Sequence, residues 1–562
     1  MFSLSRQPVA QPSAPGKLIK WTLLSCFTVM LWGCQNQAPQ QSNSASRSVS
    51  HLPAQLVSDL KSATAFSPRI TTSTLPDNIK HATIPQLTRL MEQGKLTAAE
   101  LTNYYLQQIA QYNQHLNAVI KVNPKAIEIA QQLDTMRQSG NVLGPLHGIP
   151  ILVKDNVETS TMPTTAGSLI LANNMTKRDA PIVTKLKAAG AIILGKTNLS
   201  EWANMRSERS SSGWSAVGGQ TRNPHNLHRS TCGSSSGSGA SIAAFMAVAA
   251  IGTETNGSIT CPSSANGLVG IKPTVGLLSR TAIVPISHSQ DTAGPMTRSV
   301  VDAAILLQVM QGIDPQDEAT QINQKHFSKD FISNLQQPLQ QKRIGVLFSD
   351  ALEHEAVLAL FEQFKQKIAN QTTLVNDLNV NYYNGFYADS YEVLLYEFKH
   401  TLNHYFAKLP NALNTLTMEK LIAFNQQHTA QEMPYFQQEI LVKSQAKGDL
   451  TDTAYIEALK KVQQATRQDG IDNLMNTHQL DAIMTVTLSP AWTIDRINGD
   501  HYIGGYSGLS AISGYPHITI PLGKVHGMPV GLSIAGKALS EAELIAIAYQ
   551  LEKQINYDYN IE

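Results

Sequence analysis

Hydrophobic and polar positions repeat with two different periods along this chain, and these periods predict helices and strands in alternation. Residues 84–113 place apolar side chains at helical spacing, and Thr97 with Glu100 forms a capping box that starts a second helix. Residues 179–199 predict a helix, a break at Gly190 and a strand. Such alternation is typical of an α/β protein.

Short apolar runs bounded by turn-forming residues predict the other strands, at 149–154, 344–350, 480–486, 517–523 and 528–536. The apolar run 240–251 is rich in small residues, and we expect a buried helix there. The pattern at about 351–475 is mostly helical. We therefore expect one large α/β domain over residues 81–562, with the helical portion packed on or inserted beside the sheet.

The first 34 residues have the pattern of a signal peptide. Basic residues precede a short apolar run that ends at Cys34, and this run is too short to span a bilayer. Leu-Trp-Gly-Cys at its end resembles a bacterial lipobox, which predicts lipidation of Cys34 and export to the cell envelope. A signal peptide cut elsewhere and an uncleaved anchor are the alternatives. Residues 35–80 are rich in Gln, Ser and Asn, which predicts a disordered tether.

Composition narrows the function classes. The 562 residues are 42% hydrophobic and 15% charged with a net charge of +1, as in a globular protein with a large core. No basic cluster is interleaved with aromatic residues, so we expect no nucleic-acid binding. No spacing of His and Cys indicates a metal site. Among the four cysteines, the sequence alone does not establish whether Cys232 and Cys261 pair.

Residues 233–237, GSSSG, match the nucleophile elbow of α/β-hydrolases, with Ser235 in the central place. That motif needs a strand directly before it, because the strained turn exposes the hydroxyl. The preceding TRNPHNLHRSTC is not a strand pattern, so the elbow is disfavoured. A nucleophilic Cys232 is weaker still, because no partner His lies in a recognisable context.

Lys154 ends an apolar strand, which suggests a different chemistry. Such a lysine usually extends to water, but a poorly solvated one loses its proton more readily and can act as a general base. A serine hydroxyl needs such a base to attack an amide. The Gly- and Ser-rich stretches 233–239 and 255–258 would supply hydroxyls and unobstructed backbone N–H groups.

The chain resembles the amidase signature family from about residue 84 to its C-terminus. The resemblance is carried by GIPILVKDNV, CGSSSGSGAS, GTETNGSITCPSSANGLVGIKPTVG and DTAGPMTRSVVDAA. It implies the family's fold, a single large domain in which helices flank a central mixed β-sheet. It also implies an amidase reaction without metal or cofactor.

The resemblance assigns roles by position. Ser258 would be the nucleophile, Ser234 a bridging serine that follows a cis peptide bond from Gly233, and Lys154 the proton acceptor. The oxyanion hole would be formed by the backbone N–H groups of Thr255, Asn256, Gly257 and Ser258.

Three positions depart from the commoner family pattern. Glu254 replaces a frequent Asp, Asn256 replaces a Gly, and Thr260 replaces an Arg that could pair with residue 254. These changes affect the subfamily and the substrate, and leave the three reacting side chains in place.

Weaker candidates surround these residues. We expect His147 to be structural, and Asp155 and Asn156 either to orient the lysine or to form a turn. Residues 382–398 are aromatic and are either helix core or cleft lining. Trp492 and Tyr506 lie in loops that resemble the family's substrate side.

NLSEWANMRS, GGQTRNPHNL and SPAWTIDRINGDH look most like bacterial peptide amidases, which act on peptide C-terminal carboxamides. The expected partner is therefore a small amide or a peptide amide, with membrane contact only through a lipid at Cys34. The alternatives are an amidase for N-acyl or fatty-acid amides and, in another class, a lipid-anchored solute-binding protein. A cytoplasmic amidotransferase subunit is disfavoured by the predicted export.

Overall fold

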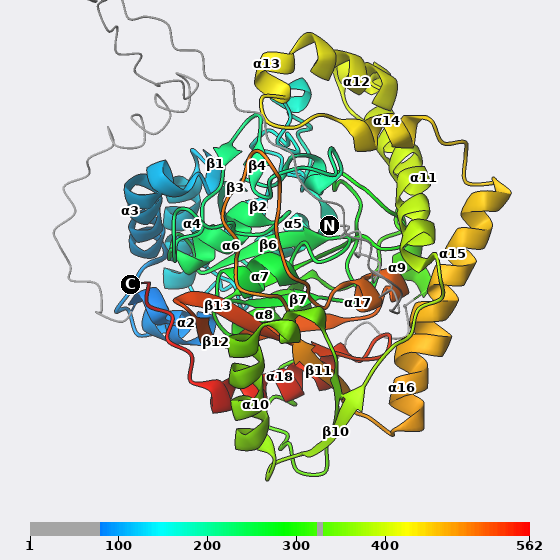
Figure 1. The fold of residues 1–562 in the computed structure, drawn as a ribbon. Helices are drawn as coiled ribbons and strands as arrows, with labels where there is room; N and C mark the ends of the chain where they lie inside the picture. Colours follow the sequence, from blue (N-terminus) through cyan, green and yellow to red (C-terminus); the bar gives the residue numbers. More distant parts are fainter. Residues whose placement is uncertain (1–78, 323–329, 562) are drawn as a thin grey trace, which may run out of the picture. The chain divides into compact units, whose positions relative to one another are not determined.

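A computed structural model describes residues 79–322 and 330–561, where mostly buried strands form one mixed sheet. Its eleven described strands lie in the order β1-β3-β2-β6-β8-β7-β12-β13-β11-β9-β10 (Figure 1). Their bounds are β1 Val119–Val122, β2 Pro150–Lys154, β3 Ile192–Thr197, β6 Ala249–Glu254, β7 Val269–Lys272, β8 Thr292–Thr297, β9 Arg343–Leu347, β10 Thr373–Leu378, β11 Ala482–Val486, β12 His517–Val525 and β13 Met528–Ala535. The expected α/β domain with a central mixed sheet is confirmed.

Strand direction changes across the sheet. β2 is parallel to both β3 and β6, whereas β8 is antiparallel to β6. Near the other edge, β9 is parallel to β10 and β11, and β12 and β13 form an antiparallel hairpin. A separate small hairpin consists of β4 (Trp214–Ser215) and β5 (Gly219–Gln220). The parallel pair β2 and β6 brings two strand ends to the same edge.

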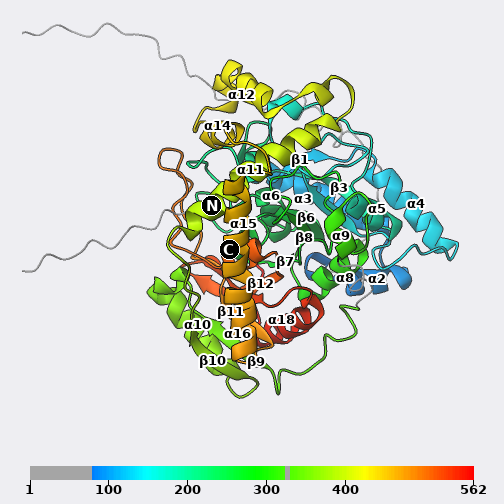
Figure 2. The same ribbon diagram turned by 90° about the vertical axis from the view of Figure 1, so that its right-hand side faces the viewer.

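Helices pack on the sheet and on one another, as Figures 1 and 2 show. The capping box at the start of α3 is confirmed, because Glu100 N–H donates to the Thr97 hydroxyl at 3.1 Å and Thr97 N–H donates to the Glu100 carboxylate at 2.8 Å. The helices outside the expected helical portion are α2 Ile84–Glu92, α3 Ala98–Leu116, α4 Ala126–Gln138, α5 Pro181–Ala188, α6 Ser236–Ala243, α7 Thr260–Ala265, α8 Val300–Met310, α9 Glu318–Ile322, α17 Gly508–Ser513 and α18 Glu541–Ile555.

The expected helical portion also contributes a strand, β10, to the sheet edge. Its helices are α10 Glu355–Ile368, α11 Phe386–Ala407, α12 Met418–Gln427, α13 Thr429–Glu432, α14 Glu439–Gln445, α15 Thr453–Thr466 and α16 Asp472–Thr477. Glu432 fixes this portion to the rest of the domain. Its carboxylate accepts hydrogen bonds from Leu169 N–H at 2.7 Å and the Ser168 hydroxyl at 3.1 Å, and it lies 3.7 Å from the buried guanidinium of Arg206.

Two sequence predictions are corrected. The run 240–251 is not one helix, because α6 ends at Ala243 and β6 begins at Ala249. All of it is buried, and periodicity does not separate a buried helix from a buried strand. The helix η1 (Ile79–His81) includes the last two residues of the expected tether. The predicted signal peptide, Cys34 and the tether up to residue 78 lie outside the described residues.

Candidate active site

Two parallel strands and one helix bring the predicted reacting residues together. β2 ends at Lys154, β6 ends at Glu254, and the segment with Ser258 follows β6 directly. Ser234 lies just before α6, which packs on both strands. Because β2 and β6 are parallel neighbours, their carboxyl ends place the lysine beside the segment after β6.

Small residues at the start of α6 permit this approach. A Cβ on Gly237 would lie 2.2 Å from the carbonyl oxygen of Ala118, so only glycine fits there. The helix serines satisfy buried acceptors, since Ser236 donates to Cys232 O at 2.8 Å and Ser238 to Ile251 O at 3.3 Å. The Gly- and Ser-rich stretch is therefore a buried, hydrogen-bonded junction.

Lys154 is fully buried and has no ion pair with any described residue. Its Nζ donates to Ser234 Oγ at 2.8 Å, to Thr253 Oγ1 at 2.8 Å and to Thr253 O at 3.2 Å. Burial lowers the pKa of this amine to about 7, against an opposing effect of the charges on Asp291 and Glu254. The amine can therefore exchange a proton near neutral pH, in direct contact with a serine hydroxyl.

Ser258 lies beside the same junction. Its carbonyl oxygen accepts a hydrogen bond from Ser235 N–H at 3.1 Å, and the residue is 7% exposed. The peptide bond between Gly233 and Ser234 is cis, as the resemblance implied. Within the part of the chain that the structure describes, the Ser258 hydroxyl makes no hydrogen bond, and the bond from Ser235 N–H to Ser258 O links the Ser258 segment to the residue after Ser234.

The segment 255–258 presents backbone donors. The N–H groups of Asn256, Gly257 and Ser258 bond to no other group in the described part of the chain. Gly257 has φ +81°, a left-handed conformation that favours glycine. The Asn256 side chain accepts from the Ser507 hydroxyl at 2.7 Å. The expected oxyanion-hole segment thus has free donors and a fixed side chain.

Glu254 has taken a different partner in place of the missing Arg. Its Oε2 accepts from Ile259 N–H at 2.8 Å, Thr260 N–H at 2.9 Å and the Thr260 hydroxyl at 3.2 Å. These donors lie at the start of α7, so the carboxylate closes the turn that carries Ser258. Thr260 therefore compensates locally for the residue that the family pattern places there.

The weaker candidates separate into two groups. Asn156 donates to Thr253 Oγ1 at 2.9 Å and thereby shares an acceptor with Lys154. Asp155 instead pairs with Lys196 at 2.9 Å, and His147 is held by the backbone of Leu143 and Leu133 at 3.0 and 2.9 Å.

Loop and elbow candidates use their polar groups within the fold. Trp492 donates to Asp500 at 2.9 Å, and the Tyr506 and Ser510 hydroxyls lie 2.8 Å apart. The Ser235 hydroxyl donates to Thr253 O at 3.1 Å and accepts from Thr253 N–H at 3.2 Å, so it is a structural group.

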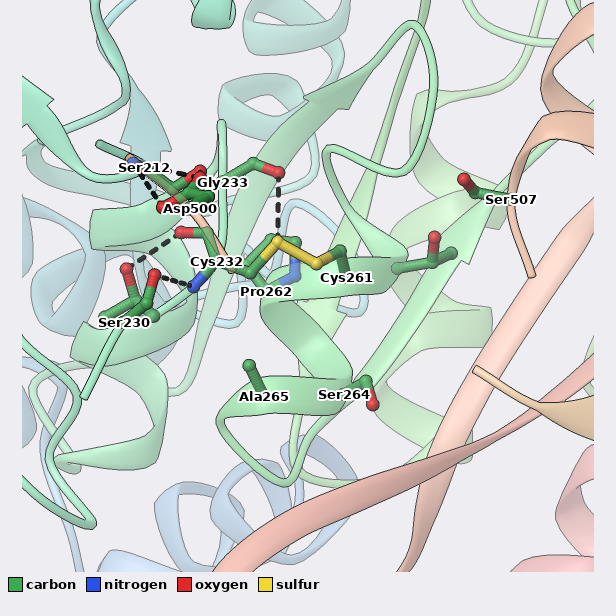
Figure 3. Close-up of a disulfide and its surroundings, with 12 residues drawn as sticks. Ser212, Ser230, Cys232, Gly233, Cys261, Pro262, Ser264, Ala265, Asp500 and Ser507 are labelled. Carbon is green, nitrogen blue, oxygen red and sulfur yellow. Dashed lines mark hydrogen bonds between the residues drawn. A yellow bond between two sulfur atoms is a disulfide. The ribbon is translucent and has the colours of Figure 1, made fainter. Parts of the chain in front are cut away.

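Cys232 and Cys261, whose pairing the sequence left open, form a disulfide (Figure 3). Cys232 precedes Gly233 and Ser234, whereas Cys261 lies in α7 and donates its N–H to Gly257 O at 2.8 Å. The bond therefore joins the two segments that carry the predicted serines.

A cavity of about 660 Å³ reaches the same strand ends. Its lining includes Asn156, Thr253, Thr255 and Asp291 and the apolar segment 282–286. This volume suits a small organic ligand. Sequence reasoning missed Thr253 and Asp291, because their proximity to Lys154 depends on the order of the strands.

Residues 79–322 and 330–561 contain no group of three or more His, Cys, Asp or Glu placed to hold a metal ion. None of the helices in this part of the chain is long and apolar enough to cross a membrane.

Comparisons with known proteins bear on the family and the fold. The Amidase family profile matches residues 100–545. The crystal structure of native peptide amidase from Stenotrophomonas maltophilia is 43% identical, with 86% of this chain and 98% of that chain covered and a TM-score of 0.82. A peptide amidase in complex with its competitive inhibitor chymostatin is 44% identical, covers 84% and 97% of the two chains and has a TM-score of 0.82. A putative amidase of Schizosaccharomyces pombe is 36% identical over 85% of this chain and 86% of its own length.

Proposed function

Because this chain belongs to the amidase signature family, we propose that it is an exported amidase that hydrolyses the C-terminal carboxamide of peptides and releases ammonia. The observation that carries the proposal is the contact between the buried Nζ of Lys154 and the Ser234 hydroxyl beside the Ser258 segment. Because the family consists of amidases, the protein is an enzyme and not the solute-binding protein considered as an alternative. The similarity to peptide amidases supports the substrate class.

In the proposed reaction, Lys154 begins as a neutral amine. It accepts the proton of Ser234 as Ser234 takes the proton of Ser258, whose oxygen attacks the carboxamide carbon. The carbonyl oxygen becomes an oxyanion that accepts hydrogen bonds from the N–H groups of 255–258.

Collapse of this intermediate breaks the C–N bond. The leaving nitrogen takes the proton back from Lys154 through Ser234 and departs as ammonia, leaving an acyl ester on Ser258. Water then attacks the ester and gives a proton to the same relay, which returns it to Ser258 Oγ as the bond to the acyl group breaks and the peptide acid leaves. The proton taken from Ser258 leaves with the ammonia, and a proton from water replaces it, so each cycle consumes one amide and one water.

A second candidate substrate class is N-acyl or fatty-acid amides. The apolar segment 282–286 that lines the cavity favours it, because such a wall can cover an acyl chain. A panel of peptide amides and long-chain acyl amides, with products identified by mass spectrometry, decides between the two. Faster turnover of the acyl amides would assign the enzyme to that class instead.

The nucleophile is tested with Ser258→Ala in the purified protein. We expect ammonia release to fall by at least about 1,000-fold and fluorophosphonate labelling to disappear, because a serine nucleophile has no substitute in the relay. Ser241→Ala is the matched control, since Ser241 is also buried but its hydroxyl bonds only to Ser238 O. Wild-type activity in a folded Ser258→Ala protein would refute the assignment.

A further inference from the structure

Asp291 contacts the predicted oxyanion-hole segment from a neighbouring strand. It directly precedes β8, and the register of β8 with β6 pairs Thr292 with Glu254. Asp291 therefore lies opposite the residue that follows β6. The Thr255 hydroxyl donates to Asp291 Oδ1 at 2.5 Å.

The second oxygen of the same carboxylate is also bound. Asp291 Oδ2 accepts from Ile286 N–H at 2.7 Å and Ser287 N–H at 2.9 Å. These donors belong to the loop that lines the cavity next to Thr255. The carboxylate is thus anchored on one side by backbone and holds Thr255 on the other.

Charge gives Asp291 a second effect on the site. The negative charge of Asp291 raises the pKa of Lys154 and so opposes the effect of burial. This effect is larger than the effect of the charge on Glu254. Glu254 is already bonded to the start of α7, and Lys196 beside β2 is paired with Asp155.

Groups around Asp291 act on its own charge as well. Burial raises the pKa of this carboxyl, whereas the Thr255 hydroxyl, the two backbone donors and the charge on Arg280 lower it. Arg280 is in turn paired with Asp317 at 2.6 Å. Of the two carboxylates that raise the pKa of Lys154, Asp291 has the larger effect.

We propose that Asp291 is a positioning residue of this site: it holds Thr255, and with it the oxyanion-hole segment, and its charge stabilises the ammonium form of Lys154 during turnover. The inference rests on the proposed function, because it assumes that Lys154 accepts a proton and that residues 255–258 bind the oxyanion. The Asp291 carboxylate slightly lowers the fraction of Lys154 that is neutral at a given pH. It also lowers the free energy of the intermediate in which Lys154 is protonated.

Asp291→Asn separates these effects by its pH profile. The asparagine carries no charge and therefore no longer opposes the effect of burial on Lys154. The pKa of Lys154 falls, and the acid limb of kcat/KM moves to lower pH by about half a unit or more. The plateau kcat falls roughly tenfold or more, because the oxyanion segment and the ammonium both lose support. Asp314→Asn is the control, since Asp314 bonds to the Ser279 hydroxyl and not to this segment.

Thr255→Val isolates the positioning effect. It removes the hydroxyl but keeps the Asp291 carboxyl, so kcat falls while the acid limb moves less than in Asp291→Asn. Thr255→Ser retains the hydroxyl and should restore kcat. Wild-type kcat in Thr255→Val would overturn the proposal, and that variant decides alone if Asp291→Asn does not fold.

The remaining outcomes are also decisive. An acid limb at the wild-type pH in folded Asp291→Asn would overturn the electrostatic role. Activity that persists in Ser258→Ala would refute the proposed function itself, whereas an inactive Ser258→Ala with a wild-type-like Asp291→Asn would refute only this inference.

Discussion

At the scale of single residues, Lys154 shows how placement determines chemistry. A lysine amine in water has a pKa near 10.4, and at neutral pH it is almost entirely protonated. Here the side chain is fully buried, its contacts are neutral oxygens, and burial lowers its pKa to about 7. A lysine at a strand end that opened to water would stay protonated and could not accept a proton.

This pKa predicts the pH dependence of turnover. Only the neutral amine can accept a proton, so kcat/KM should rise as pH increases through about 7 and then level off. A pH–rate profile with a neutral peptide amide measures it, because such a substrate does not titrate in that range.

Substitution of the lysine provides the control for this prediction. Lys154→Met keeps an unbranched side chain of similar length but cannot accept a proton, and we expect its rate to fall by about 100-fold or more. Its residual activity should lack the acid limb near pH 7. A limb at the same pH in Lys154→Met would show that another group titrates.

At the scale of elements, the segment from Cys232 to Cys261 acts as one unit. It contains the Ser234 turn, α6, β6 and the Ser258 turn, and the disulfide closes it at its two ends. The backbone bonds of Ser235 to Ser258 and of Cys261 to Gly257 lie inside this closed loop. The segments of the two serines are therefore held by one covalent bond and two backbone hydrogen bonds.

Removal of the disulfide should weaken this unit. Closure of a loop with a sequence separation of 29 stabilises a folded chain by about 3 to 4 kcal/mol in the chain-entropy description. We expect the double variant Cys232→Ala/Cys261→Ala to unfold at a lower temperature and to lose kcat more than KM, because the serine spacing becomes less fixed. Thermal unfolding and steady-state kinetics measure both effects.

A reductant supplies the matched comparison. A dithiol that reduces the wild-type bond to two thiols, and is itself oxidised, should lower wild-type activity towards that of the double variant. It should leave the double variant unchanged. Equal kcat in oxidised wild type and the double variant would show that the bond does not position the serines.

The helices and strands also show how much of the fold can be predicted from the sequence. The strand at Lys154, the capping box at Thr97 and the C-terminal hairpin follow from local patterns, and the structure contains all three. The pattern at 240–251 predicts one helix and does not reveal β6, because a wholly buried run has no polar face that shows its period. Asp291 was missed because it reaches Thr255 across the β6–β8 pairing, which no local pattern specifies.

At the scale of the whole molecule, the disulfide bears on where the protein works. Structural disulfides persist in oxidising compartments and are rare in the cytosol. The sequence of residues 1–34 independently predicts export, with Cys34 as the lipid acceptor. If residues 1–34 direct export, the disulfide that joins the two serine segments would form after export.

The last prediction tests this link on the full-length chain in a bacterial host. If Cys34 carries a lipid, wild-type protein should incorporate a labelled fatty acid and fractionate with membranes, whereas Cys34→Ser should lose the label and be released. Cys26→Ser is the matched control, because Cys26 lies within the apolar run and is not at the predicted cleavage site. Thiol titration of the wild-type enzyme should find Cys232 and Cys261 oxidised. Undiminished label in Cys34→Ser would contradict lipidation of Cys34, and free thiols at Cys232 and Cys261 would contradict the proposed export.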